Sequence, residues 1–162
     1  MPGMTAAEVD EFLAEPGHLV RIGTADQEGM PLVVPTWFIA RDGMVLVTPR
    51  ERSAWFGHLQ RDPRVCFTID EELAPLRKVV LRGRIQTVHG LGHDDDWRDI
   101  YRSITLRYVP PAGADAYLTS THDEPRALLG LSIAEAKVTT WRMPGRPGED
   151  PLAVWAPKYY HR

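Results

Sequence analysis

The sequence has few of the features that would tie it to an extracellular or membrane setting. It contains one cysteine in 162 residues, so no disulfide can form within one chain, which suits a reducing compartment. Cys66 lies between Val65 and Phe67, and we expect a buried, unpaired thiol there. No apolar run approaches the ~20 residues of a membrane helix, and the acidic start MPGMTAAEVDEFLAEPG is unlike a signal peptide. We therefore expect a cytoplasmic protein without a membrane segment.

Basic residues are not in excess either. The formal net charge is −3, whereas a general nucleic-acid binder normally presents a basic surface. Apolar residues make up 43% and charged residues 25%, which is typical of a soluble globular chain, and neither a repeat nor a low-complexity tract is present. These values predict one domain over residues 1–162 that does not bind nucleic acid.

Well-known catalytic and metal-binding motifs are also missing. The sequence has no G-x-S-x-G, P-loop, G-x-G-x-x-G, C-x-x-C or H-E-x-x-H. His89 and His93, close to Asp94–Asp96, could suggest a metal site, but their spacing does not define a ligand geometry. An acidic helix N-terminus explains the aspartates better. We predict no metal site, and no catalytic residue can be named.

What the sequence does contain is a series of short β-type runs behind an N-terminal helix. Thr5 and Glu8 have capping-box spacing, and Pro16-Gly17 ends this helix, so residues 1–17 form one element. Residues 18–88 form the predicted β core. Its expected strands are Leu19–Thr24, Pro31–Ile39, Met44–Thr48, Arg64–Ile69 and Arg77–Val88.

One apolar run and several single positions in this core predict local geometry. The run from Leu32 to Ile39 is apolar on both sides apart from one threonine, which predicts a central strand buried on both faces. Pro35 inside it cannot donate a ladder hydrogen bond, so the strand either bulges there or faces a ligand. Asp42-Gly43 predicts a tight hairpin, and Gly83 predicts a sharp bend.

The second half of the chain changes period. Residues 93–120 are predicted to form a helical insertion, in which Trp97, Tyr101 and Tyr108 lie on one packed face. Residues 126–143 contain the last two strands, and residues 144–162 form a tail rich in proline and glycine. The aromatic residues late in this tail could bury it on the domain or a partner subunit, or could wall a ligand cleft.

The junction between Met44–Thr48 and the helix expected at Ala54–Arg61 is the best candidate site. Arg50 and Arg52 lie in the turn, and Ser53 is a good helix N-cap. Basic side chains beside a helix N-terminus form a natural anion site. The alternative is a solvated turn with an ordinary cap.

The order GMPLVVPTWF, VLVTPRERS, LQRDPRV and VVLRGR resembles the pyridoxamine 5′-phosphate oxidase-like superfamily, which includes deazaflavin (F420)-dependent reductases. The resemblance covers roughly residues 12–88. It implies a mainly β fold, a six-stranded antiparallel Greek-key split β-barrel with peripheral helices. It also implies a homodimer that holds a cofactor in clefts between the subunits.

The resemblance assigns residues to this cleft position by position. Those that would line the flavin ring are Val34, Pro35, Thr36 and Trp37. Those that would surround the cofactor phosphate are Thr48, Arg50, Arg52 and Ser53. Arg82 would border the same cleft. Relatives usually carry a basic residue shortly after the serine, where this chain has Ala54 and Trp55.

Two arginines could replace the missing charge, because a guanidinium binds phosphate through two hydrogen bonds, while Trp55 could stack on a ring or fill the pocket. The resemblance implies an oxidoreductase that uses FMN, or alternatively F420, to transfer a hydride to or from a small organic substrate. A non-catalytic binder of haem or another tetrapyrrole is the second hypothesis. A third is a structural dimer whose site has decayed.

Overall fold

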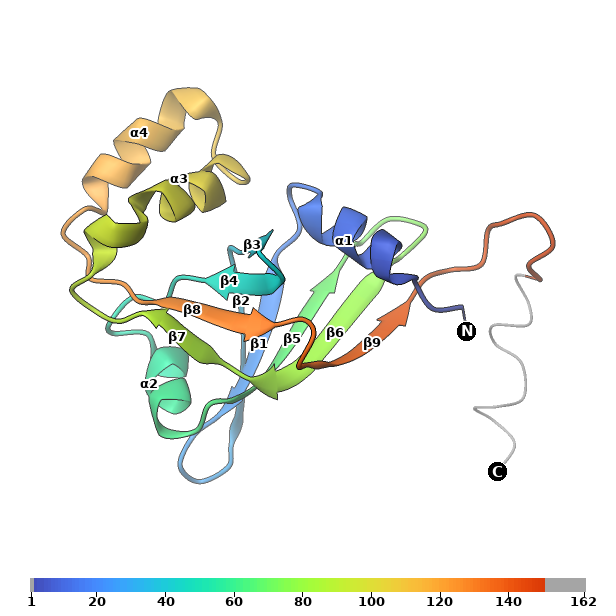
Figure 1. Cartoon of the computed structure of the whole chain (residues 1–162), viewed down its shortest axis with the longest axis horizontal. Coiled ribbons are helices and arrows are strands. Elements are labelled where there is room, and N and C mark those ends of the chain that lie inside the picture. Colours follow the sequence, from blue (N-terminus) through green and yellow to red (C-terminus); the bar gives the residue numbers. More distant parts are fainter. Residues whose placement is uncertain (1, 151–162) are drawn as a thin grey trace.

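A computed structural model describes residues 2–150 of the chain (Figure 1). The described helices are α1 (Ala6–Ala14), α2 (Ala54–Arg61), the 3-10 helix η1 (Asp94–Trp97), α3 (Arg98–Leu106) and α4 (Pro111–Ser120). The described strands are β1 (Val20–Ala25), β2 (Pro31–Thr36), β3 (Ile39–Arg41), β4 (Met44–Val47), β5 (Arg64–Asp70), β6 (Lys78–Arg84), β7 (Gln86–His89), β8 (Leu128–Ser132) and β9 (Lys137–Trp141).

The strands form two antiparallel sheets. One has the order β2-β1-β5-β6-β9 and the other β3-β4-β8-β7. The mainly β fold with flanking helices is therefore confirmed, whereas the described strands do not close into a single six-stranded barrel. The difference arises because two predicted strands, 31–39 and 77–88, are each divided, with one half in each sheet.

The division of the second long run does not fall at Gly83. Gly83 pairs regularly with Val65, and the ladder is interrupted at Ile85, whose N–H donates to the Pro63 carbonyl at 2.8 Å. A Cβ added at Gly83 would lie 2.9 Å from the Leu131 side chain of the other sheet. The glycine is thus required by the close approach of the two sheets, two residues before the chain passes from one to the other.

Strand β2 differs most from its prediction. It is an edge strand that pairs only with β1, so its outward side chains are exposed, and Val33 retains 63% of its accessible surface. The expectation of a central strand buried on both faces was wrong. Pro35 is exposed at this edge, where the strand needs no second hydrogen-bonded neighbour.

The hydrophobic core lies between the sheets and extends under α1, whose Phe12 and Leu13 are fully buried. The capping box is confirmed, because the Thr5 hydroxyl accepts from the Glu8 N–H and the Glu8 carboxylate accepts from the Thr5 N–H. The Asp42-Gly43 hairpin is also confirmed.

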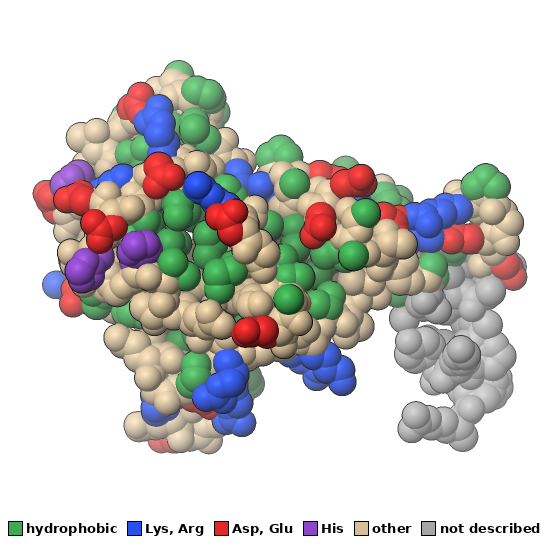
Figure 2. Space-filling view, in the orientation of Figure 1, with side chains coloured by type: hydrophobic (Ala, Val, Ile, Leu, Met, Phe, Trp, Pro, Cys, Tyr) green, Lys and Arg blue, Asp and Glu red, His purple; other side chains and the backbone are tan. Residues whose placement is uncertain are grey.

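Cys66 is half-buried rather than buried, because it points to the outer face of its sheet while Val65 and Phe67 point inward. Helices α3 and α4 form a hairpin at one end of the molecule, and α1 lies nearer its middle, above strands β5 and β6 (Figure 1). On the face drawn in Figure 2, acidic and basic side chains are interspersed around a hydrophobic centre. None of the helices in residues 2–150 is long and apolar enough to cross a membrane. The aromatic residues predicted late in the tail, from Trp155 on, lie outside the described residues.

Candidate functional site

Most of the residues singled out in the sequence come together around one cavity of about 480 Å³, a size usual for small-molecule sites. It lies where β2, the end of β4 and the start of α2 meet the α3–α4 hairpin. The predicted residues that line it are Val34, Pro35, Thr36, Trp37, Thr48, Arg50, Ser53 and Trp55. The residues that sequence reasoning did not assign to it are Leu19, Pro49, Tyr101, Tyr117 and Arg126.

The cationic side of the cavity consists of Arg50 and Arg126. These residues form an isolated antiparallel bridge, so their side chains leave neighbouring backbones on the same side. Arg50 has 53% of its side chain exposed, whereas Arg126 has only 8%. The cavity thus combines one exposed guanidinium with one that is buried in the fold.

Arg126 is held by several contacts, including an ion pair with Glu124 at 3.2 Å. Its Nη1 donates to the Thr48 carbonyl at 3.3 Å, its backbone N–H donates to Asp94 at 2.9 Å, and its guanidinium lies 4.8 Å from the centre of the Tyr101 ring. Its Nε is buried and has no hydrogen-bond partner among residues 2–150. A buried donor without an acceptor costs free energy, so an anion at this position would be stabilised.

The start of α2 adds neutral donors to the same side. Ser53 is the N-cap, but contrary to expectation its hydroxyl makes no capping hydrogen bond and lines the cavity instead. Its carbonyl accepts from the N–H groups of Phe56 and Gly57. The two preceding N–H groups, of Ala54 and Trp55, have no acceptor within the helix, and the helix dipole makes this end favourable for negative charge.

An aromatic wall, formed by Trp37 and Tyr117, lines the same cavity. The Trp37 ring stacks on Tyr108 with 5.1 Å between centres and 4° between planes, and it lies 5.2 Å from Tyr117 at a tilt of 51°. Burial raises the pKa of the Tyr108 phenol, which stays protonated and donates to the His18 carbonyl at 2.7 Å. Trp37 is therefore fixed from behind as an apolar surface on which a flat ring could stack.

Three predicted residues lie elsewhere or contribute less than the pattern suggested. Arg52 lines a neighbouring cavity of about 310 Å³. This cavity shares only Arg50 with the cavity of about 480 Å³, which we call the main cavity. Arg82 is exposed on the outer face of the five-stranded sheet, where it lines a third cavity. Trp55 borders the main cavity but is only 6% exposed, so most of its indole packs in the core.

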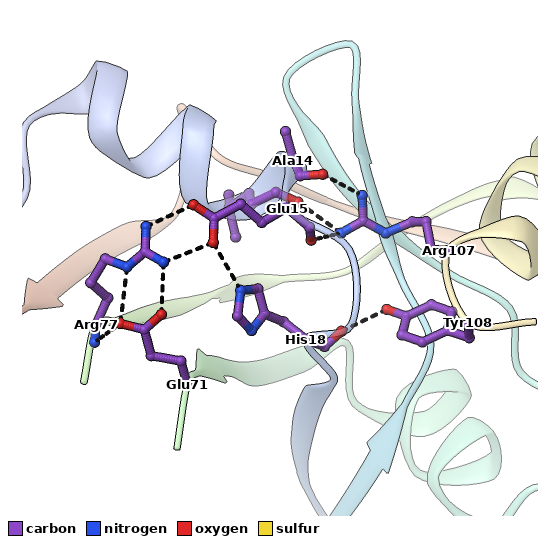
Figure 3. Close-up of polar contacts among 8 residues, drawn as sticks. Ala14, Glu15, His18, Glu71, Arg77, Arg107 and Tyr108 are labelled. Carbon is purple, nitrogen blue, oxygen red and sulfur yellow. Dashed lines mark hydrogen bonds and ion pairs between the residues drawn. The ribbon is translucent and has the colours of Figure 1, made fainter. Parts of the chain in front are cut away.

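A second polar cluster lies below α1 (Figure 3). The side chains of Glu15, His18 and Glu71 place possible ligand atoms within 4.8 Å of one another, a spacing that could hold a metal ion. However, the Arg77 guanidinium lies between the carboxylates and donates to Glu15 at 2.7 Å and to Glu71 at 2.7 Å. A cation from the chain itself thus satisfies this cluster, which we interpret as structural.

The residues that the sequence did not reveal as part of the site carry no local signal for a ligand. Tyr101 and Tyr117 lie in the helical insertion, where their spacing indicates only a packed face, and Tyr101 is indeed 2% exposed. Arg126 follows a proline and precedes an apolar strand, a position without a local signal. Only the pairing of the Arg50 and Arg126 backbones brings the second guanidinium to the site.

Comparison with known proteins places the chain in a family. Residues 5–140 match the family described as pyridoxamine 5′-phosphate oxidase. This match covers more than half of the sequence, so the chain belongs to that family. No curated protein matches the sequence closely.

Solved structures share the fold at low identity. An F420 reductase is 17% identical with a TM-score of 0.59, covering 80% of this chain and 94% of the other. A FAD-binding protein from Mesorhizobium loti is 21% identical with a TM-score of 0.59, covering 86% and 93%. The haem storage protein HutZ from Vibrio cholerae is 15% identical with a TM-score of 0.63, covering 86% and 96%.

Proposed function

We propose that this chain binds a flavin-type cofactor in the main cavity and acts as an oxidoreductase on a small organic substrate. FMN is the first choice of cofactor and F420 the alternative. Similar structures include a FAD-binding protein and an F420 reductase, which supports a flavin-related function. The observation that carries the proposal is the buried Arg126 side chain, which lines the cavity together with Trp37 and Tyr117 and whose Nε has no hydrogen-bond partner among residues 2–150.

The phosphate of the cofactor would bind on the cationic side. Arg126 supplies a preorganised donor, Arg50 adds a second positive charge, and the Ser53 hydroxyl adds a neutral donor at the helix N-terminus. Two guanidinium groups replace the basic residue that relatives carry after the serine. The positions of Ala54 and Trp55 are therefore compatible with phosphate binding.

The ring of the cofactor would lie along β2. The bound flavin or deazaflavin supplies the hydride chemistry, whereas the protein supplies orientation and exclusion of water. Val34 and Thr36 line the cavity from the strand, and the Trp37 ring, backed by Tyr108, provides a flat apolar face. We assign no acid or base, since positioning and desolvation are the roles that these side chains can fill.

Haem is the second candidate ligand, because the haem storage protein HutZ has a similar fold. Haem iron needs an axial ligand, most often histidine, cysteine or methionine. Within residues 2–150, the lining of the main cavity includes none of these, and its two tyrosines, a rarer type of axial ligand, are buried (Tyr101) or half-buried (Tyr117). The lining therefore favours a cofactor held by its phosphate over one held by its metal.

A homodimer would complete the site. The cavity borders the exposed edge strand β2, so a second copy seated on this edge would cover one side of the cofactor. The interface would also bury Val33, whose exposure is costly in a lone chain.

Titration of the purified protein with FMN, F420 and haemin tests the proposal. We expect saturable binding of FMN or F420, followed by reduction of the bound cofactor and its reoxidation by a member of a panel of small electron acceptors. Tight binding of haemin alone would instead support the second candidate, and binding of none of the three would refute both.

A further inference from the structure

One carboxylate contacts both arginines of the main cavity. It belongs to Glu124, which lines the neighbouring cavity of about 310 Å³ together with Arg50. The Glu124 Oε2 atom lies 2.9 Å from Arg50 Nε and 3.2 Å from Arg126 Nη2. A single oxygen therefore accepts from both guanidinium groups. These are the groups that would hold the phosphate of a ligand, so the chain carries its own anion at the proposed anion site.

We propose that Glu124 is an internal competitor, which a phosphate must displace from Arg50 and Arg126, and which thereby determines which anions the site accepts. This inference rests on the proposed function, because it takes the two arginines as the phosphate site. It adds a residue that opposes binding to those that promote it, and it assigns that residue a role in specificity.

Burial decides which member of the cluster can move. Arg126 is 8% exposed and is fixed by the Thr48 carbonyl and the Tyr101 ring. Glu124 is 42% exposed and lies in the connection between α4 and β8, so its side chain can turn to solvent without opening the core. Exchange of the carboxylate for a ligand anion then leaves the buried guanidinium in place.

The charges indicate which ligand gains from the exchange. Two guanidinium groups carry two positive charges, and Glu124 neutralises only one of them. A phosphate monoester with two negative charges that replaces Glu124 neutralises both. A carboxylate or a phosphodiester has one negative charge, so replacing Glu124 with it neutralises no additional positive charge. A phosphate that bound without displacing Glu124 would share the same two guanidinium groups with a second negative charge, which is unfavourable. The site should therefore favour a terminal phosphate monoester.

The chain offers a matched control next to Glu124. Asp123 is in the same connection and is fully exposed, and its described ion pair is with His122 at 3.3 Å rather than with the arginines. Glu124→Gln and Asp123→Asn both remove one negative charge and keep the shape of the side chain. Only the first removes the competing carboxylate, so the pair separates local competition from a change in net charge.

The test measures the affinities of FMN and of riboflavin, which lacks the phosphate, for the wild-type protein and both variants. We expect E124Q to bind FMN about tenfold more tightly and riboflavin unchanged. We expect D123N to change either affinity by less than about twofold. An unchanged or lower ratio of FMN to riboflavin affinity in E124Q would overturn the role of Glu124, although FMN binding itself would still support the proposed function.

Inorganic phosphate provides a probe that is independent of the flavin. If neither FMN, riboflavin nor F420 binds the wild type or E124Q, the proposed function fails. Phosphate titrations followed by changes in ³¹P line width then decide on Glu124. Tighter phosphate binding to E124Q than to both the wild type and D123N would uphold the inference, and equal phosphate affinities would overturn it.

Discussion

Arg126 and Arg52 differ in a way that the sequence does not reveal. Both lie beside the junction of β4 and α2, but Arg126 is buried against the main cavity and Arg52 is exposed in the neighbouring one. An anion gains more from a preorganised, desolvated donor than from a solvated one, because less water must be displaced and less side-chain freedom is lost. We therefore assign the larger share of phosphate binding to Arg126.

Arg126→Gln should weaken FMN binding roughly thirtyfold, equivalent to about 2 kcal/mol for the loss of charged hydrogen bonds. Riboflavin affinity should hardly change, because the aromatic wall stays intact. Arg52→Gln serves as the control of equal chemistry and should leave both affinities near the wild-type values. Isothermal titration calorimetry measures all three proteins. A larger loss of FMN affinity in R52Q than in R126Q would contradict the assignment.

Most residues that line the main cavity could be predicted from the sequence, but its buried guanidinium, that of Arg126, could not. A strand, a turn and a helix start that are close in sequence are also close in space, which is why Thr48, Arg50 and Ser53 could be predicted together. Arg126 lies 76 positions after Arg50, two residues before β8, and no local pattern records which backbone segments pair across such a distance. The burial of single side chains could not be predicted from the sequence either, because Trp55 packs mostly in the core and Cys66 is half-buried rather than buried.

Helix α1 illustrates what holds an element to the sheets. Its C-terminal carbonyls accept from the Arg107 guanidinium, at 3.0 Å for Leu13 and 2.7 Å for Glu15, and the Glu15 side chain binds Arg77 (Figure 3). Cations at this end also complement the helix dipole. The sequence predicted the N-terminal cap of this helix because a capping box is local. The arginines at its other end, Arg77 just before β6 and Arg107 at the C-cap of α3, left no local signal.

Arg77→Met should lower the free energy of unfolding by roughly 2 kcal/mol near neutral pH, because it leaves two carboxylates without their charged donor. The Arg77 hydrogen bonds hold the pKa of Glu15 and of Glu71 below its ordinary value of 4.5. A carboxyl with a lowered folded-state pKa stabilises the fold above its unfolded pKa, and this stabilisation is lost as the pH falls through the folded value. The difference from wild type should therefore shrink below about pH 4.5.

Urea titrations at several pH values measure this effect. Arg102→Met is the control, since Arg102 pairs with Asp115 at an exposed site where both side chains are about half or more exposed. Exposed ion pairs contribute little, so R102M should remain within about 0.5 kcal/mol of wild type. A difference for R77M that stays constant from neutral to acidic pH would refute the role assigned to the two carboxylates.

The arrangement of whole strands was only partly predictable. The family pattern correctly indicated a mainly β protein, but two apolar runs, 31–39 and 77–88, each read as one strand. Hydrophobic periodicity records which faces are apolar, and it does not record where a chain leaves one sheet for another. The apolar outer side of β2 is instructive in this respect. In the single chain Val33 is exposed, and a second subunit would supply the cover that the sequence pattern led us to expect.

Val33→Glu should therefore weaken the proposed dimer, because it places a charge in the interface next to the cavity. Leu73→Glu is the matched control, as Leu73 is 80% exposed in the loop after β5, away from that edge. Sedimentation velocity over a range of concentrations should show V33E dissociating at a concentration at least about tenfold higher than that for L73E and wild type. Equal dissociation of the two variants would exclude this edge as the interface.

Native mass spectrometry of the freshly purified protein tests the central proposal most directly, because it reports stoichiometry and bound cofactor together. We expect a species of two 18.3 kDa chains that carries two molecules of FMN, or of F420 where the producing cell supplies it. A single chain that gains no mass after incubation with either cofactor, or a dimer that carries haem instead, would contradict it.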